Sequence, residues 1–384
     1  MKREKRTALV LTTINVPCAL EKYIENCKAY GHNNVFFVVV GDMKSPPETT
    51  PYLLSLKSLG YDIVYLSVEK QRDWLLKYPD FSNFLPYNSV QRRNIGYLCA
   101  YEMNADLIVS IDDDNIPLPH YDYVGEHTIV GDTITCDFVR SSSGWFNSCS
   151  LLQSEPPRSF YHRGYPVSKR WLPDKISYVK GKGRVVVNVG LWIGDPDVDT
   201  ITRMEEPFRV TAVKEVNSRI CLAADTIAPF NSQNTAFLAE LLPCIYLISF
   251  KSGTAAEIFR GNNNFRYDDI WMSYFAKIVI DRMGDAVCIG PPYVEQIRNK
   301  HDYLLDLRKE ICPMEMTNKM ADLLSSIQLT EKSYLGCYKE LIGHLRTKVA
   351  THTSFSSNEQ DLLNAMINGM LLWIDVVSKI TRES

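Results

Sequence analysis

The chain has 384 residues, of which 45% are hydrophobic and 23% are charged, values typical of a globular protein. Its net charge of -3 provides no global basic field that would attract nucleic acid or an anionic membrane. No apolar stretch reaches the roughly 20 residues that span a bilayer, and the ten cysteines form no CxxC pair. We therefore expect a soluble protein of the reducing cytoplasm, without a disulfide framework, a zinc site or a nucleic-acid partner.

The first hundred or so residues alternate between strand and helix. Continuous apolar runs between helical segments are typical of a parallel sheet that is covered on both faces. We expect strands at 8–13, 35–40, 63–66 and 107–111, with helices at 19–30 and 89–102. The pattern predicts an α/β domain whose ligands gather at the carboxyl ends of the strands.

The pattern becomes mixed after residue 114. Strands are expected at 133–139, 184–189 and 286–289, with an amphipathic helix at 270–281. The short basic run Lys180-Gly181-Lys182-Gly183-Arg184 is too short for a duplex-binding surface, and we interpret it as a solvated hairpin turn.

Beyond residue 301 the sequence is helical, with apolar periodicity in 316–327, 334–349 and 362–380. We predict a catalytic domain over 1–301 and a helical C-terminal region over 302–384. This region either packs on the core or forms a homo-oligomer interface.

Polar residues stand at the ends of three predicted strands. Thr13 and Asn15 stand at the end of the first strand, Asp42 follows the second, and the triplet Asp112-Asp113-Asp114 follows the strand at 107–111. Because the carboxyl ends of parallel strands share one edge of a sheet, these side chains are expected to converge. Thr13, Asn15 and Asp42 are expected to line the base and ribose of a nucleotide.

The aspartate triplet directly follows a buried strand. Three adjacent carboxylates repel one another, so a cation is expected to offset that cost. Hard oxygen ligands suit Mg²⁺ or Mn²⁺, which can also bridge two phosphate oxygens. Alternate residues of an extended segment point the same way, so Asp112 and Asp114 are predicted to share the metal. The alternative is a solvated acidic turn.

The triplet is preceded by a helix that opens with Arg92-Arg93-Asn94, and this arrangement resembles the GT-A glycosyltransferase pattern. The chain resembles more closely the reversibly glycosylated polypeptides of plants, the UDP-arabinopyranose mutases, and it shares a helix start with STELLO-like glycosyltransferases. Five blocks over roughly residues 8 to 310 carry the resemblance, in the same order: Arg93–Tyr97, Asp112–Asn115, Arg163–Arg170, Gly190–Trp192 and Arg266–Trp271.

The resemblance implies a GT-A (Rossmann-like) mixed sheet sandwiched by helices, a nucleotide-sugar donor (a UDP-sugar), a sugar or glycan acceptor, and Mn²⁺ or Mg²⁺. The residues that it assigns to the donor are Arg92, Arg93, Asn94, Asp112 and Asp113. In the mutase family the arginine matching Arg163 is thought to carry the sugar transiently, and the one matching Arg170 is also needed. Guanidinium groups grip phosphate bidentately, which agrees with a role at the diphosphate. The alternative is a β-turn whose arginines pack over aromatic rings.

Asp268 and Asp269 open the helix that follows Arg266-Tyr267. By analogy with GT-A enzymes, one of them would face the acceptor as general base or hold a sugar hydroxyl, and which one is left open. The alternative is a helix N-cap, where the backbone N–H groups and the dipole favour aspartate.

The chain departs from the family in three places. In the family, an aromatic residue followed by histidine resembles the third metal ligand of many GT-A enzymes, and near that place this chain has Glu295-Gln296, with His301 as the substitute. Asn115 replaces a cysteine of the family. The segment Asn231–Asn234 replaces another family segment, near where an acceptor would lie. These changes favour a glycosyltransferase acting on a glycan or small-molecule acceptor. The alternatives are a UDP-sugar pyranose/furanose mutase with reversible self-glycosylation at Arg163, and a non-catalytic sugar-nucleotide-binding scaffold.

Overall fold

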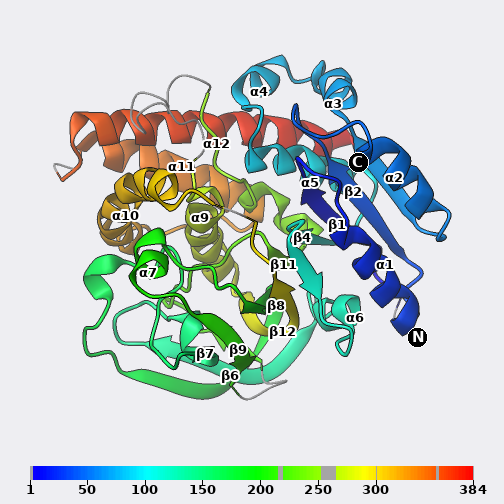
Figure 1. The fold of residues 1–384 in the computed structure, drawn as a ribbon. Helices are drawn as coiled ribbons and strands as arrows, with labels where there is room; N and C mark the ends of the chain where they lie inside the picture. The colour runs from blue at the N-terminus through cyan, green and yellow to red at the C-terminus, as the bar shows by residue number, and fades with distance from the viewer. Residues whose placement is uncertain (1–2, 215–218, 252–264, 300, 352–353, 384) are drawn as a thin grey trace.

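The computed structural model describes residues 3–214, 219–251, 265–299, 301–351 and 354–383. It confirms the α/β class: a mixed sheet lies between helices, and a group of C-terminal helices lies along one side (Figure 1). Along the sheet the strand order is β3-β2-β1-β4-β11-β8-β6-β10-β12-β5, and β9 pairs with both β7 and β8.

The N-terminal half of the sheet is parallel, as predicted. Its strands are β1 (Thr7–Thr12), β2 (Val35–Val40), β3 (Asp62–Leu66) and β4 (Leu107–Ile111). All residues of β2 and β4 are buried, which explains why these strands read as continuous apolar runs and not as alternating patterns. The flanking helices are α1 (Ala19–Tyr30), α2 (Thr49–Lys57), α3 (Val68–Leu75), α4 (Pro79–Phe84) and α5 (Arg93–Glu102), the last preceded by the 3₁₀ turn η1 (Val90–Arg92).

Strand β11 (Asn234–Leu238) joins the parallel half to a mixed half. It runs antiparallel to β4 on one side and to β8 (Ile176–Gly194) on the other. Strand β8 also pairs with β6 (Thr133–Ser141) and with β12 (Ala286–Gln296). The shorter elements of this half are β5 (Asn115–Pro117), α6 (Tyr123–His127), β7 (Leu152–Glu155), α7 (Thr200–Glu205), β9 (Arg209–Val213) and β10 (Ile220–Leu222).

The hairpin turn expected at Lys180–Arg184 is wrong. These residues lie inside β8 and pair with β6 from Thr133 to Asp137. The glycines serve the packing of the Phe138 ring: a Cβ at Gly181 would lie 2.7 Å from that ring. Glycine therefore marks a close approach within a strand here, which sequence alone does not distinguish from a turn.

The C-terminal region is helical, as predicted, and comprises α10 (Tyr303–Ser325), α11 (Tyr334–Thr351) and α12 (Ser357–Glu383). Helix α11 packs on α9 (Asp268–Met283) and on the 3₁₀ segment η4 (Ala239–Cys244), and α12 packs on α11 and α4. The buried apolar side chains of these helices belong to the same core cluster as the sheet. The boundary at residue 302 and an oligomer interface on these helices stay predictions.

We expected no apolar stretch as long as a membrane span, but helix α12 contains a segment of that length. Its segment 357–381 passes a test of length and composition for such a span, and 56% of its apolar window is buried inside the protein. The core helix of a soluble protein passes the same test. One buried contact shows how it docks: Trp373 stacks on Tyr246, with ring centroids 5.5 Å apart, and its indole N–H donates to Pro243 O at 3.1 Å.

We predict that Trp373→Ala lowers the free energy of unfolding by about 3–5 kcal/mol, because it opens a cavity and leaves the Pro243 carbonyl without its donor. Leu371→Ala, at a position on the same helix that is 43% exposed, is the control and should cost under about 1 kcal/mol. Urea unfolding of both variants measures the difference. Equal effects would mean that α12 does not depend on this contact.

Candidate functional site

Two cavities meet at the carboxyl ends of the parallel strands. The strand-end cavity, of about 540 Å³, is lined by Thr13, Asn15, Asp42, Arg93, Asp113 and Asn299, among others. The Arg163 cavity, of about 300 Å³, is lined by Gln91, Arg163, Asp197, Ser232, Asp268, Asp269 and Arg298, among others. Both are lined by Val90, Asp112, Asp114 and His301, so the acidic triplet lies at their junction. The predicted convergence of strand ends is therefore present.

Arg93 is the buried cation beneath the triplet. Its side chain is only 2% exposed and forms an ion pair with Asp112. The same guanidinium donates to Thr12 Oγ1 at 3.1 Å, to Ser110 Oγ at 3.1 Å and to Ser232 O at 2.8 Å. Neighbouring carboxylates, Asp112 above all, raise the pKa of Arg93 although burial opposes this. Arg93 thus holds one carboxylate of the triplet in place.

The other strand-end residues support the loops around the strand-end cavity. The Thr13 hydroxyl donates to Asp113 Oδ2 at 2.6 Å and accepts from the Asn15 backbone N–H at 2.9 Å. Asp42 accepts from the backbone N–H groups of Met43 at 2.7 Å and Ser89 at 3.0 Å. Each of the two carboxylates retains acceptor capacity for a ligand.

The residues of the triplet have the chemistry that a divalent cation requires. Burial together with the negative charges of Asp112 and Asp113 raises the pKa of Asp114 to about 7. This cost is what a bound cation would remove, and carboxylate oxygens are the ligands that Mg²⁺ and Mn²⁺ prefer. Among the described residues, however, no group of three or more His, Cys, Asp or Glu side chains is arranged as a metal site.

His301 lines both cavities and so lies near the triplet, as its predicted role requires. Its Nδ1 is hydrogen-bonded to Asp306 Oδ2 at 2.8 Å. A carboxylate at one ring nitrogen is the usual way in which proteins orient a metal-binding histidine by its other nitrogen. Ligation by His301 stays a prediction.

Arg163 is held by two carboxylates in the second cavity. Its Nε and Nη2 donate to Asp197 at 2.9 and 3.1 Å, and Nη2 also reaches Asp269 Oδ1 at 3.3 Å. Its Nη1 donates to the backbone carbonyl of Arg266. The two carboxylates raise the pKa of Arg163 against the effect of burial, and the guanidinium holds the pKa of Asp197 well below its usual range. This arginine is fixed, charged and largely satisfied.

Asp268 and Asp269 have different environments, although they are adjacent. Asp269 accepts from the backbone N–H and the hydroxyl of Ser232 at 3.0 and 3.2 Å, as well as from Arg163. Asp268 accepts from Gln91 Nε2 at 2.9 Å. Burial, reinforced by the charge of Asp269, raises the pKa of Asp268 to about 8. At neutral pH Asp268 is therefore a proton donor, and Asp269 is the better candidate for a base or a sugar ligand.

Three predicted site residues line neither cavity. Arg92 donates to Gln71 Oε1 at 2.6 Å and lies over the Tyr87 ring. Asn94 exchanges hydrogen bonds with the backbone of Leu247. Arg170 pairs with Asp199 at 2.7 Å and lies over the Tyr161 ring, as the aromatic-packing alternative describes. Their contacts hold together segments that are distant in sequence.

Sequence reasoning missed Asp197 and Arg298, and it named Ser232 only as part of the segment Asn231–Asn234. Asp197 lies three residues after the end of the long strand β8, and Asp195 directly follows that strand, so carboxylates after a strand indicate the region but not the residue. Ser232 has no comparable pattern, because its role depends on the Arg93 and Asp269 side chains, which are distant in sequence.

The fold and its cavities define an α/β protein with carboxylates and buried arginines at the carboxyl ends of its parallel strands. The sequence pattern of the family described as "Reversibly glycosylated polypeptide" matches residues 13–380, and the chain belongs to this family.

Similar proteins bear related names. UDP-arabinopyranose mutase 3 of Arabidopsis thaliana is 26% identical over 217 residues, which cover 56% of this chain and 52% of that protein. Probable UDP-arabinopyranose mutase 2 of Solanum tuberosum is 26% identical over 55% of this chain and 52% of that protein. The chain thus spans about half the length of the curated relatives it matches.

Solved structures of similar fold include the following two proteins. TarS of S. aureus with UDP-GlcNAc has a TM-score of 0.43 and 10% identity, covering 98% of this chain and 80% of that one. A mannosyltransferase from Pyrobaculum calidifontis with GDP-Man and Mn²⁺ has a TM-score of 0.36 and 12% identity, covering 100% and 89%.

We predict that Asp112→Asn and Asp114→Asn have opposite effects on stability in EDTA. Asp112→Asn removes the carboxylate partner of Arg93 and should cost on the order of 2 kcal/mol. Asp114→Asn removes a carboxylate whose folded-state pKa lies above its unfolded value, so at pH 8 it should raise the melting temperature. Thermal melts test both predictions. A lower melting temperature for Asp114→Asn would show that the crowded charges of the triplet do not destabilise the fold.

We predict that Asp268→Asn raises the free energy of unfolding, and that this gain depends on pH. Because folding raises the pKa of Asp268, the ionised carboxylate destabilises the folded state. This destabilisation is absent below about pH 4, grows as the pH rises, and is complete above about pH 8. The variant should match the wild type near pH 4 and exceed its unfolding free energy by on the order of 2 kcal/mol at pH 8.5. Urea unfolding at the two pH values measures this, with the exposed Asp73→Asn as control. A gap independent of pH would show that titration is not the cause.

Proposed function

We propose that this chain is a cytoplasmic enzyme that binds a nucleotide-diphosphate sugar, a UDP-sugar, across the two cavities and transfers the sugar to a glycan or small-molecule acceptor. The observation that carries the proposal is the junction of the two cavities at Asp112 and Asp114. The strand-end cavity would take the nucleotide, the triplet the diphosphate, and the Arg163 cavity the sugar. Membership of the reversibly glycosylated polypeptide family supports the same class of donor.

Within this arrangement, Asp112 and Asp114, with His301, would hold Mn²⁺ or Mg²⁺, which would supply positive charge to the departing diphosphate. Arg93 fixes Asp112 from below. The hydrogen bond between Thr13 and Asp113 holds the loop after β1 beside the strand-end cavity, and Asp42 fixes the turn before α5. These two segments of the cavity lining would therefore be in position before the donor binds. Asp269 would accept a hydroxyl proton, and the protonated Asp268 would donate a hydrogen bond to a sugar oxygen.

The state of Arg163 supports transfer in preference to self-glycosylation. A guanidinium can attack an anomeric carbon only after it loses a proton, and Asp197 with Asp269 favours the charged form. A fixed charge next to the triplet would instead stabilise negative charge as the nucleotide departs.

A second candidate is the UDP-sugar mutase, which the family and the names of the relatives favour. Arg163 lines the cavity proposed for the sugar, and Asp197 and Asp269 are within reach to accept its proton. In that reaction the bond between C1 and the diphosphate oxygen breaks and a bond from a guanidinium nitrogen to C1 forms. A scaffold that binds the donor unchanged is the remaining alternative.

We predict that Arg163→Lys keeps partial transferase activity, because the charge survives while the bidentate contact to Asp197 is lost. The loss should be on the order of 2–4 kcal/mol, or roughly 30- to 1,000-fold in rate. Arg158→Lys, which changes an arginine paired with the exposed Glu205, is the matched control and should keep full activity.

Incubation with a panel of UDP-sugars, with and without acceptors, supplies the measurement. A glycosylated acceptor supports the transferase. Isomerised donor together with a hexose or pentose adduct on Arg163, seen by intact-mass spectrometry, would instead establish the mutase. Donor that is bound but unchanged under all conditions would establish the scaffold.

A further inference from the structure

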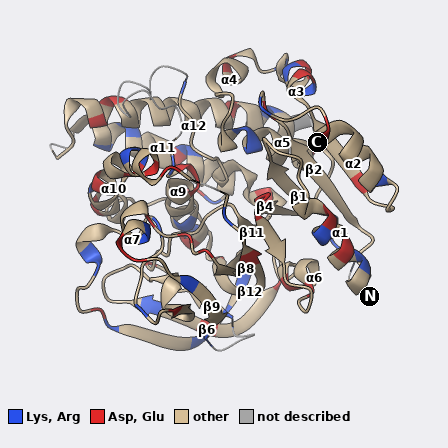
Figure 2. Cartoon of the chain, viewed as in Figure 1, with Lys and Arg blue, Asp and Glu red and all other residues tan. Residues whose placement is uncertain are grey.

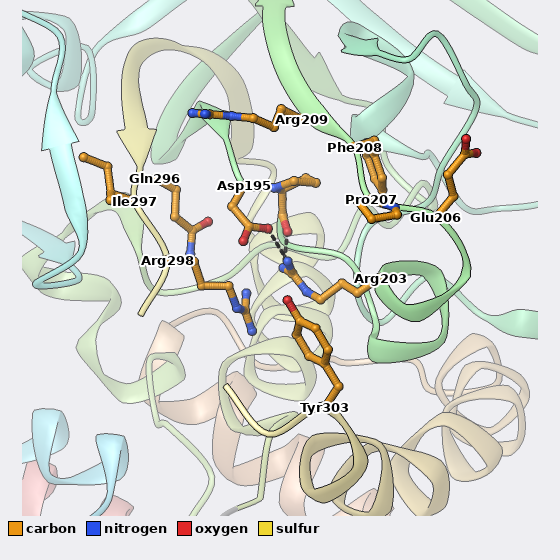
Figure 3. A pocket seen from close by; sticks show the side chains of 11 residues that line it. Asp195, Arg203, Glu206, Pro207, Phe208, Arg209, Gln296, Ile297, Arg298 and Tyr303 are labelled. Atoms are coloured by element: carbon orange, nitrogen blue, oxygen red, sulfur yellow. Dashed lines mark hydrogen bonds and ion pairs between the residues drawn. The ribbon is translucent and has the colours of Figure 1, made fainter. Parts of the chain in front are cut away.

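A third cavity adjoins the proposed sugar site. This outer cavity, of about 380 Å³, shares Gln296 and Arg298 with the Arg163 cavity. Figure 3 shows three of its arginines, Arg203, Arg209 and Arg298, around one space, with Phe208 and Tyr303 at its walls. The arginines come from α7, β9 and the segment after β12, Phe208 directly precedes β9, and Tyr303 begins α10.

Most charges around the outer cavity are already compensated. Arg203, whose side chain is only 6% exposed, is bound by Asp195, as Figure 3 shows. It is also bound by the backbone carbonyl of Pro196. The Glu206 carboxylate lies 3.7 Å from Arg158, which is not part of the lining. Among the described residues, neither carboxylate of the cavity forms an ion pair with Arg209 or Arg298.

Arg298 is the exception. Within the described part of the chain it has no hydrogen bond or ion pair, and its Nε is buried without a partner. Burial and the nearby Arg203 and Arg266 lower the pKa of Arg298 to about 10, although the charges of Asp197 and Asp195 oppose this shift. At the rim, Arg209 is 69% exposed and pairs with Glu295 at 3.5 Å. A half-buried cation among other cations is costly unless an anion binds to it.

The excess of positive charge at the outer cavity is not a feature of the whole molecule. Figure 2 shows lysines and arginines dispersed among aspartates and glutamates over the helices, in agreement with the small net charge of -3. The anion attraction of the outer cavity is therefore local and does not come from a general basic surface.

We propose that the outer cavity binds a phosphate or carboxylate group of the second substrate, with Arg298 as its main ligand and Arg209 at the rim. That the anion belongs to an acceptor rests on the proposed function, since the outer cavity opens beside the site proposed for the sugar. Guanidinium groups bind both anions through paired N–H donors, and Phe208 and Tyr303 offer apolar walls for the rest of the molecule.

The diphosphate of the donor is the competing source of the same chemistry. Arg298 is close enough to Asp114 for its charge to lower the pKa of that carboxyl, and it lines the Arg163 cavity as well. The two sources differ in one respect: an acceptor subsite binds its anion while the nucleotide is present, whereas a diphosphate ligand does not.

Titration of the full chain with inorganic phosphate, followed by calorimetry with and without saturating UDP and Mg²⁺, tests the proposal. Phosphate should bind in both conditions. Arg298→Gln should weaken phosphate at least tenfold, Arg209→Gln at least threefold, and Arg298→Lys less than Arg298→Gln. The exposed Arg308→Gln, which removes the same charge from α10, should leave phosphate binding unchanged. The affinity for UDP should change less than threefold in every variant.

Three results would overturn the proposal: displacement of phosphate by UDP, an equal loss of UDP and phosphate binding in Arg298→Gln, or equal phosphate binding in Arg298→Gln and Arg308→Gln. Thermal melts show whether each variant is folded, and Arg209→Gln, at an exposed side chain, tests the cavity if Arg298→Gln fails to fold. The measurement without nucleotide keeps the two proposals separable. If UDP does not bind, the proposed function fails while phosphate still reports on the outer cavity.

Discussion

The buried guanidinium of Arg93 connects the two halves of this protein. It extends from α5, contacts β1 and β4 of the parallel half, and binds Ser232 just before β11, where the mixed half begins. The same group pairs with Asp112 at the edge of both cavities. Because a buried charge without a partner costs several kcal/mol, this one residue couples the closure of the sheet to the position of the acidic triplet.

The rest of the site follows the same principle, since its carboxylates are placed against fixed cations. Asp197 and Asp269 compensate Arg163, and Ser232 contributes hydrogen bonds to Asp269. Burial and a neighbouring carboxylate raise the pKa of Asp114 and that of Asp268. The three carboxyl groups of the triplet are crowded at the junction of the cavities. Arg298 is the opposite case, a cation that forms no ion pair among the described residues, and it lines both the Arg163 cavity and the outer cavity.

The helical C-terminal region contributes to the site as well as to stability. Glu310, on α10, accepts from Arg266 at 2.8 Å, and the Arg266 carbonyl in turn accepts from Arg163. Thr317 accepts from the Trp271 indole of α9, the helix that begins with Asp268 and Asp269. Hydrogen bonds therefore connect α10 to residues of the proposed sugar site.

The sequence by itself determined the parallel half of the sheet, the helical C-terminus and the place of the triplet. Apolar runs of five or six residues between helices are typical of strands of a parallel sheet, and carboxylates that directly follow such a strand emerge at its carboxyl end. The pattern of residues is local in all these cases, so the linear sequence contains it.

The tertiary structure alone decided which arginines serve the site. Arg92, Arg93 and Asn94 are adjacent in sequence, yet only Arg93 faces the cavities, because the other two are bound by Gln71 and by the Leu247 backbone. Likewise Arg163 lines a cavity whereas Arg170 pairs with Asp199, and the glycines of Lys180–Arg184 accommodate Phe138 within a strand. A side chain's direction and partner depend on residues distant in the chain, and no local pattern specifies them.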